Sequence, residues 1–368
     1  MYLERLRRRI AELAAAGLRR DVRSEAPADV RDFSSNDYLG LRAQRDVVAA
    51  LRRANVAGSS GARLLSGAAA EHARLETVLS AYTRREATLL FSSGYLAAAG
   101  TVAALAPHFA CVYSDEKNHA SLIDGVRLSK SERIVYRHLD VTAIARERRS
   151  KLIVTESRFG MDGDCADIAA LVAALGPDDA LLVDEAHALG VEGARGAGLC
   201  AEFADERVLV LGTLSKSFGV LGGFVAGPRD AVAYLMNAAR TFVFDTALPP
   251  ALAEAAIVAV HLAARADEAR ARLLEHARVA RQRIASAGFD VAGASAHIVP
   301  VLTRDVETTL AVQRALLERR VLVAAIRPPT VAAGSSRLRI SLTAGHGDAD
   351  VDALVEGLRA CGPCAAIS

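Results

Sequence analysis

Short apolar runs alternate with longer mixed segments through the middle of the chain. These runs are rich in leucine and β-branched residues, and they lie at 89–91, 111–113, 152–155, 180–183, 208–211 and 224–226. Each run is too short for a helix, so each predicts a buried strand. Alanine-rich or amphipathic segments separate most of them and predict helices. Strands separated by helices indicate an α/β protein with a mostly parallel sheet covered by helices on both faces.

The two ends of the chain show other patterns. Residues 1–20 place arginines on one face of a predicted helix, with Leu3, Leu6 and Ile10 on the opposite face. Residues 248–290 predict a long helix or a helix pair. Beyond them, strands are predicted at 298–303, 321–326 and 337–342, with helices near 306–320 and 348–360. We therefore expect an N-terminal helix and connector (1–42), a large domain (43–247) and a smaller C-terminal α+β domain (248–368).

Composition excludes several classes of protein. A net charge of +2 argues against a dedicated nucleic-acid surface. No apolar run is long enough to span a bilayer, and no apolar segment of a targeting peptide follows the basic helix. Five cysteines without a secretion signal favour reduced thiols in the cytoplasm. Cys361 and Cys364 form a C-x-x-C pair that follows the last predicted helix, and we interpret this pair as incidental.

Glycine, charged residues and histidines follow directly after the predicted strands. The set comprises Gly94, His119, Glu156, Asp184, His187 and Lys216. In parallel sheets, ligands bind beyond the carboxyl ends of the strands, so these residues are expected to converge on one site. The turn before Gly94 leads from a strand into a helix, where N–H groups and the helix dipole favour an anion such as phosphate.

Lys216 is one of only four lysines in the chain, the others being Lys117, Lys130 and Lys151. It lies on a hydroxyl-rich loop between two apolar runs. Lysine can lose its proton and act as a nucleophile, whereas arginine cannot. Taken alone, the loop fits equally well a reactive buried amine and a lysine whose stem packs while its head reaches water.

The sequence lacks the motifs that two other kinds of site would require. Asp184-Glu185-Ala186-His187 spells the DEAH box of nucleic-acid motors, but the chain has no Gly-Lys pair and therefore no Walker A loop. A zinc site would need a third ligand near Asp184 and His187, so no metal is expected.

Pyridoxal phosphate (PLP) chemistry uses all parts of the set. Lys216 would bind the cofactor aldehyde and Asp184 its pyridine nitrogen. His187 could reach the phenolic oxygen, and His119 could stack on the ring. We expect the phosphate to be held by Gly94, Tyr95 and Thr213, and we count Glu156 among the cofactor-binding residues.

Motifs along nearly the whole chain resemble the α-oxoamine synthase family of PLP-dependent enzymes. They comprise Ser34–Gly40, Phe91–Tyr95, Asn118–Leu122, Met161–Asp164, Asp184–His187, Thr213–Gly219 and Ile326–Val331. The resemblance implies an aspartate-aminotransferase-like fold (PLP fold type I) and a cytoplasmic homodimer with the active site at the subunit interface. One departure is Gly160, which stands where the family usually carries a serine that contacts the cofactor.

The resemblance also implies substrates and roles. Ile326–Val331 is most similar to the family member of biotin biosynthesis, which condenses L-alanine with a pimeloyl thioester (of CoA or a carrier protein) and releases CO2 and the thiol. Lys216 would act as the base on alanine. Residues expected to contact substrate are Arg19, Asn36, Thr330 and Arg339, and Thr246 would reach the partner subunit's phosphate. The alternatives are a sister synthase that uses glycine or another acyl thioester, and a non-catalytic PLP-binding protein.

Overall fold

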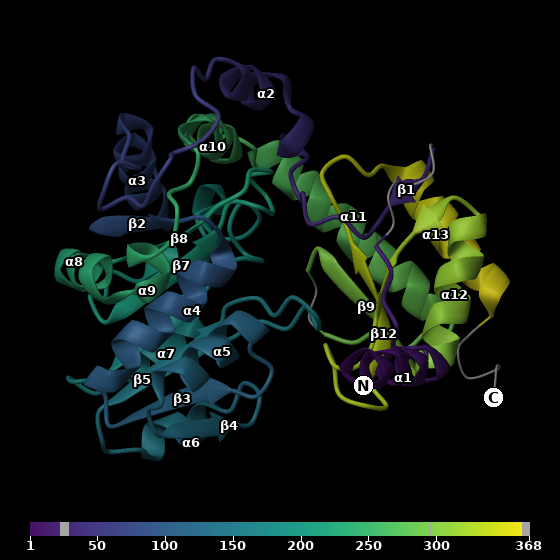
Figure 1. Cartoon of the computed structure of the whole chain (residues 1–368). Coiled ribbons are helices and arrows are strands. Elements are labelled where there is room, and N and C mark those ends of the chain that lie inside the picture. The colour runs from purple at the N-terminus through teal and green to yellow at the C-terminus, as the bar shows by residue number, and fades with distance from the viewer. Residues whose placement is uncertain (23–28, 294–295, 363–368) are drawn as a thin grey trace. The chain divides into compact units, whose positions relative to one another are not determined.

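The computed structural model describes residues 1–22, 29–293 and 296–362 and divides into two compact units (Figure 1). The first, here called the sheet unit, comprises Asp37–Gly160 and Asp164–Arg270. The second, called the terminal unit, is formed within Met1–Asn36, Met161–Gly163 and Ala271–Ser368. Residues 1–36 therefore group with the C-terminal part of the chain, whereas 248–270 group with the sheet.

A seven-stranded sheet forms the centre of the sheet unit. Its order is β2-β8-β7-β6-β5-β3-β4. The strands are β2 (Ala87–Phe91), β3 (Cys111–Asp115), β4 (Arg133–Tyr136), β5 (Lys151–Glu156), β6 (Ala180–Asp184), β7 (Val208–Thr213) and β8 (Gly223–Gly227). β8 is antiparallel to both of its neighbours, and the other pairings are parallel. The predicted class, α/β with a mostly parallel sheet, is confirmed.

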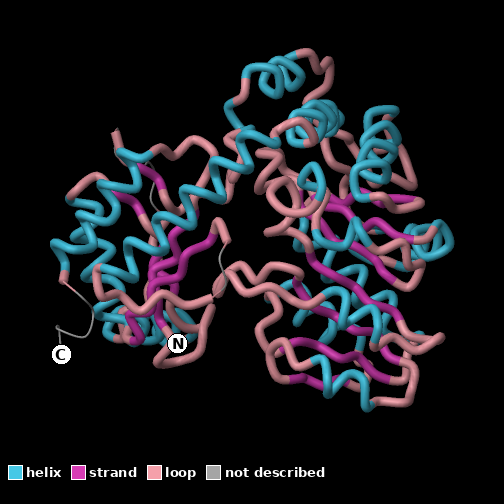
Figure 2. Tube along the Cα trace, turned by 180° about the vertical axis from the view of Figure 1, so that it is seen from behind, coloured by secondary structure: helices cyan, strands magenta, loops and turns pink. Residues whose placement is uncertain are grey.

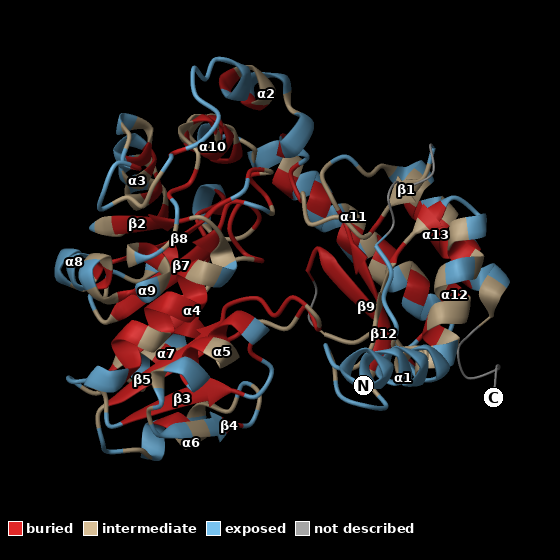
Figure 3. Ribbon diagram, in the orientation of Figure 1, coloured by how far each residue is buried: buried red, intermediate tan, exposed pale blue. Residues whose placement is uncertain are grey.

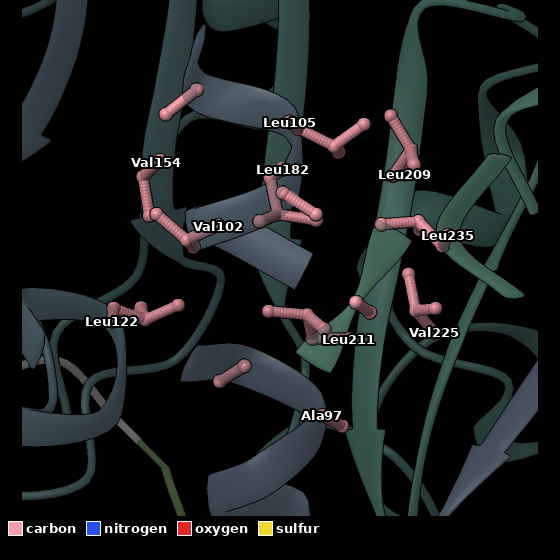
Figure 4. Packing of buried hydrophobic residues seen from close by; sticks show 14 of the residues in the cluster. Ala97, Val102, Leu105, Leu122, Val154, Leu182, Leu209, Leu211, Val225 and Leu235 are labelled. Atoms are coloured by element: carbon pink, nitrogen blue, oxygen red, sulfur yellow. The ribbon is translucent and has the colours of Figure 1, made fainter. Parts of the chain in front are cut away.

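Alternation of side chains along the strands builds a core on each face of this sheet. In β6, Leu182 joins one cluster whereas Leu181 and Val183 join the other. Figure 4 shows Leu182 and Leu209 of the first cluster packed beside residues of α4. Because both faces are buried, the strands are continuous apolar runs instead of alternating ones.

Helices cover both faces (Figure 2). Residues of α4, α5, α8 and α9 contribute to one cluster, and residues of α6 and α7 contribute to the other. The helices of this unit are α2 (Arg45–Arg52), α3 (Ala70–Thr83), α4 (Gly94–Leu105), α5 (Ala120–Ser129), α6 (Val141–Arg146), α7 (Ile168–Ala173), α8 (Arg229–Ala238), α9 (Arg240–Val243) and α10 (Pro250–Ala263).

The terminal unit contains a smaller sheet. Its three antiparallel strands have the order β11-β12-β9, and β1 pairs with β10 in a parallel two-stranded sheet. The strands are β1 (Arg31–Asp32), β9 (Ile298–Arg304), β10 (Val321–Leu322), β11 (Ala324–Ile326) and β12 (Ser336–Ser341). The helices are α1 (Tyr2–Ala15), α12 (Val306–Glu318), α13 (Asp348–Cys361) and, from Ala271 onward, α11 (Asp267–Ser286). The helix pair expected in 248–290 is thus α10 and α11.

The residues of α1 are mostly exposed, whereas those of the central strands are mostly buried (Figure 3). α1 buries none of its residues, and Leu3, Leu6 and Ile10 are each about half exposed. The helix is therefore amphipathic, as predicted, and the described residues cover its apolar face only in part. Among the described residues, no helix is both long and apolar enough to cross a membrane. Cys364 lies outside the described residues, so the interpretation of the C-x-x-C pair stays a prediction.

An ion-pair cluster anchors the loop after β4. His138 Nδ1 lies 2.9 Å from Asp115 at the end of β3, and its Nε2 lies 3.1 Å from Asp164. Burial alone would lower the pKa of His138, but the hydrogen bonds to the two carboxylates outweigh it and raise the pKa to about 9. At neutral pH the ring is therefore a largely buried cation, with its side chain 11% exposed, held between two carboxylates.

This cluster predicts a loss of stability at alkaline pH. The folded-state pKa of His138 exceeds the value of about 6.5 for an unfolded histidine. Its contribution is complete below pH 6.5 and disappears as the pH rises toward 9, for a loss of about 3 kcal/mol. Urea unfolding at pH 6, 7.5 and 9 should show this decline in the unmodified chain and a flatter profile in His138→Gln. Equal slopes in the two proteins would contradict it.

Candidate active site

A cavity of about 270 Å³ opens at the carboxyl ends of the parallel strands in the sheet unit. Its lining includes residues from the ends of β5, β6 and β7 and from the first turn of α4. Every strand-end residue singled out from the sequence lines it, namely Gly94, His119, Glu156, Asp184, His187 and Lys216, and so do Tyr95 and Thr213. The structure therefore brings these eight residues together in one place.

Lys216 is half-buried at the edge of this cavity. Its Nζ lies 3.0 Å from Nε2 of His187, a ring that is 7% exposed. On its other side, Nδ1 of His187 lies 2.7 Å from the hydroxyl of Tyr38. Tyr38 belongs to the motif Ser34–Gly40, but the sequence analysis assigned it no role.

Two carboxylates stand side by side at the ends of adjacent strands. Glu156 of β5 and Asp184 of β6 are register partners. Burial and, to a smaller extent, the neighbouring charge of Asp184 together raise the pKa of Glu156 to about 8, although Lys216 opposes the shift. At neutral pH Glu156 is therefore mainly protonated.

His119 is held in place through its backbone and through its ring. Its N–H donates to Oε1 of Glu156 at 2.7 Å. Its Nδ1 accepts a hydrogen bond from the N–H of Ser121 and thereby caps α5. Nδ1 is then unprotonated, and the proton of the neutral ring lies on Nε2. Although the residue is exposed at the cavity, surrounding protein lowers the pKa of the ring, so the neutral form dominates at pH 7.

The first turn of α4 and the end of β7 form a space suited to a phosphate group. Ser93 caps α4 by accepting the N–H of Leu96 at 3.3 Å. A Cβ on Gly94 would lie 2.9 Å from Cβ of Thr213, and a Cβ on Gly223 would lie 2.4 Å from the Gly94 nitrogen. The two glycines thus allow the helix start, with its N–H groups and positive dipole end, to lie against Thr213.

Gly160 makes room for the ring of His187. A Cβ at this position would lie only 2.2 Å from Nε2 of His187. A serine here would displace the ring from its present position beside Lys216. The departure from the family pattern at residue 160 therefore removes one hydroxyl and leaves room for the histidine ring.

Two of the expected substrate-binding residues contact each other within the terminal unit. Arg339 of β12 is buried and donates from Nη1 to Oδ1 of Asn36 at 2.9 Å. Thr330 is exposed and accepts from Nη2 of Arg20 at 3.1 Å. Arg19, which is also expected to contact substrate, forms an exposed 3.0 Å ion pair with Asp21. Its neighbour Arg20, which the sequence analysis did not single out, is the arginine that donates to Thr330.

The remaining expected residues are Thr246 and those of the Met161–Asp164 motif. Thr246 is exposed in the segment between α9 and α10. The acidic residues of the Met161–Asp164 motif form ion pairs, Asp162 with Arg337 and Asp164 with His138. These two motif residues therefore act within the protein as structural partners.

The cavity matches the chemical groups of PLP. The amine of Lys216 stands where an aldehyde could be bound, and the side chain of Asp184 is available for a pyridinium nitrogen. The glycine-bounded start of α4 suits a phosphate. The residues present therefore fit this cofactor.

Comparison with known proteins gives the class of the chain. Residues 28–358 match the family Aminotransferase class I and II. A solved structure of serine palmitoyltransferase (SPT) from Sphingomonas wittichii superimposes with a TM-score of 0.89 at 29% identity, covering 97% of this chain and 96% of that chain. A second SPT structure, solved with PLP, has the same TM-score and coverage at 28% identity. The chain is thus a PLP-dependent enzyme with the aminotransferase fold, and the predicted fold class and cofactor are confirmed.

A close sequence relative narrows this class. The 8-amino-7-oxononanoate synthase of Aromatoleum aromaticum is 43% identical over 379 residues, covering 97% of this chain and 98% of that protein. The chain belongs to the family of 8-amino-7-oxononanoate synthases, PLP-dependent acyltransferases of biotin biosynthesis. The expected resemblance to the α-oxoamine synthases, and to their biotin-pathway member in particular, is confirmed.

Proposed function

We propose that this enzyme condenses L-alanine with a pimeloyl thioester to give 8-amino-7-oxononanoate, CO2 and the free thiol. The observation that carries the proposal is the juxtaposition of Lys216, His187 and Asp184 around one cavity, in a chain that is 43% identical to an 8-amino-7-oxononanoate synthase. PLP, when bound, withdraws electrons from the alanine Cα and so makes both the loss of CO2 and the acylation feasible.

Lys216 is the residue we propose as anchor and base. Its amine can bind the cofactor aldehyde and, once displaced by substrate, can take a proton from the alanine Cα. His187 stands beside this amine and can donate a hydrogen bond from Nε2 to the oxygen on the cofactor ring. Asp184 keeps a negative charge available for the ring nitrogen, while the protonated neighbour Glu156 adds no second charge.

His119 is proposed to stack on the cofactor ring and to assist the acyl transfer. Because Ser121 occupies its Nδ1, the Nε2 proton is the one available to the acyl carbonyl oxygen. The phosphate is proposed to bind the N–H groups of Gly94 and Tyr95 and the hydroxyl of Thr213.

Two residues of the terminal unit are proposed to bind the carboxylate of alanine. Arg339 presents a guanidinium, the side chain best matched to a carboxylate, and Asn36 orients it through the 2.9 Å hydrogen bond. Thr330 and Arg19 are proposed as further substrate contacts, as the family resemblance implies. Arg20 joins them because it is the arginine that bonds to Thr330.

We also propose that the enzyme is a cytoplasmic homodimer, with Thr246 reaching the phosphate in the partner's site. The support is the family resemblance and the exposure of Thr246. Sedimentation velocity of the purified chain, whose mass is 38.7 kDa per subunit, measures the assembly.

A thiol-release assay tests the reaction. Purified enzyme with PLP should release one thiol and one CO2 per turnover when given L-alanine and pimeloyl-CoA or a pimeloyl-carrier protein. Glycine and L-serine, and acyl-CoA donors of other lengths, serve as competing substrates. A higher kcat/KM with glycine or with another acyl length would assign the chain to a sister synthase. Bound PLP without thiol release from any pair would indicate a non-catalytic protein.

A further inference from the structure

Tyr38 is a buried residue whose hydroxyl reaches the candidate active site. Its side chain is fully buried, and its hydroxyl oxygen lies 2.7 Å from Nδ1 of His187. On the opposite side of that ring, Nε2 lies 3.0 Å from Nζ of Lys216. A phenol, an imidazole and an amine therefore form a continuous hydrogen-bonded chain within the sheet unit. The roles proposed above use the imidazole and the amine but not the phenol.

This series of hydrogen-bonded groups can determine which ring nitrogen of His187 carries the proton. A neutral imidazole carries one proton, and its other nitrogen can only accept. A phenol ionises near pH 10 and is a better donor than a neutral imidazole N–H, so the O–H of Tyr38 donates and Nδ1 accepts. Nε2 then carries the proton of the neutral ring, and Nζ of Lys216 can accept this proton in a hydrogen bond when the amine is in the unprotonated form that reacts with an aldehyde, because an ammonium group has no lone pair.

The position of the ring is set from another side by Gly160. Because a Cβ on residue 160 would lie 2.2 Å from Nε2, any side chain there would push the ring out of line with Tyr38 and Lys216. The hydroxyl of Tyr38 thus orients the ring, and the bare backbone of Gly160 leaves the space that this orientation requires.

We propose that Tyr38 is a positioning residue that holds His187 with its proton on Nε2, in a space left open by Gly160. The Nε2 proton is the one His187 needs to donate a hydrogen bond to an oxygen of the cofactor ring, so the effect on turnover rests on the proposed function. The effect on the tautomer does not rest on it, because it concerns only residues of this chain.

Nitrogen-15 NMR of histidine-labelled enzyme measures the tautomer directly. The signal of His187 among the nine histidines is assigned from its absence in His187→Gln. In the unmodified enzyme the proton should lie on Nε2. In Tyr38→Phe, which keeps the ring packing, a substantial fraction should move to Nδ1. Loss of an orienting hydrogen bond to a site histidine typically costs about 10- to 100-fold, so kcat should fall by about 10-fold or more while KM for alanine changes little.

Three controls separate positioning from a general loss of structure. Tyr82→Phe removes another hydroxyl, one that donates to the carbonyl oxygen of Gly196 at 2.6 Å, and should change neither the tautomer nor kcat. Gly160→Ala should displace the His187 ring and shift its signals even if Tyr38→Phe folds poorly. In the His187→Gln background, Tyr38→Phe should cause no further loss of kcat.

Two results would overturn the proposal. One is an unchanged His187 tautomer in Tyr38→Phe together with unshifted His187 signals in Gly160→Ala. The other is a full additional loss of kcat when Tyr38→Phe is added to His187→Gln. If no acyl thioester is turned over at all, the proposed function fails, but the NMR measurement still decides the role of Tyr38.

Discussion

Lys216→Arg is expected to abolish acyl transfer, lowering kcat by about 10³-fold or more. Arginine places a similarly long basic side chain near His187, but its guanidinium stays protonated and cannot act as a nucleophile or base. Borohydride reduction of the unmodified holoenzyme, followed by digestion and mass spectrometry, should find a pyridoxyl group on the peptide that contains Lys216. The variant should yield no such peptide.

Lys130→Arg provides the matched control. Lys130 is an exposed lysine at the C-terminal end of α5, outside the residues that line the cavity. The same chemical change should leave turnover and covalent trapping unchanged there. Trapping at another lysine, or substantial thiol release by Lys216→Arg, would show that the anchoring amine had been misassigned.

The geometry of parallel sheets explains why the convergence of the cavity residues could be predicted from the sequence. Strand ends fall on one edge, so locating the apolar runs was enough to predict that Asp184, His119 and Lys216 would meet. The same reasoning predicted the start of α4 from its Ser/Gly turn. The spacing of apolar residues was therefore enough to predict most of the helices and strands and most of the residues that line the cavity.

The features that were missed depend on packing between distant segments. β4 was not predicted because its short run of residues 133–136 is half exposed and begins with arginine. Tyr38 lies in a turn-rich segment, where nothing local distinguishes a buried hydroxyl near a histidine from an ordinary surface tyrosine. Arg20, the arginine that donates a hydrogen bond to Thr330, was not singled out from the sequence. None of these follows from spacing along the chain.

The pair Glu156 and Asp184 shows how burial assigns different roles to two similar groups. Both are carboxylic acids at adjacent strand ends, and each lines the same cavity. Glu156 is deeply buried and its pKa is raised to about 8, so it accepts the His119 N–H while mainly neutral. Asp184, and not Glu156, is therefore the carboxyl group that we propose to face the ring nitrogen of the cofactor.

Asp184→Asn is accordingly expected to retain PLP but lower kcat by about 10- to 1,000-fold. An adjacent opposite charge shifts a pKa by about 1–3 units, or about 1.4–4 kcal/mol, and this shift keeps a ring nitrogen protonated at neutral pH. An amide supplies no such charge, although it can still accept the N–H of Ala186 as Oδ1 of Asp184 does at 2.8 Å. Steady-state kinetics and the absorbance of bound PLP measure the two effects separately.

Glu156→Gln makes the same substitution on the neighbouring strand. Because Glu156 is mainly protonated at pH 7, the amide copies its neutral form and can still accept the His119 N–H, so kcat at pH 7 should fall less than about 3-fold. Above pH 8 the two enzymes should diverge, since only the unmodified one gains a second carboxylate charge beside Asp184. Equal losses in Asp184→Asn and Glu156→Gln at pH 7 would mean that the charge is shared between the two strand ends, and the electrostatic role proposed for Asp184 would then fail.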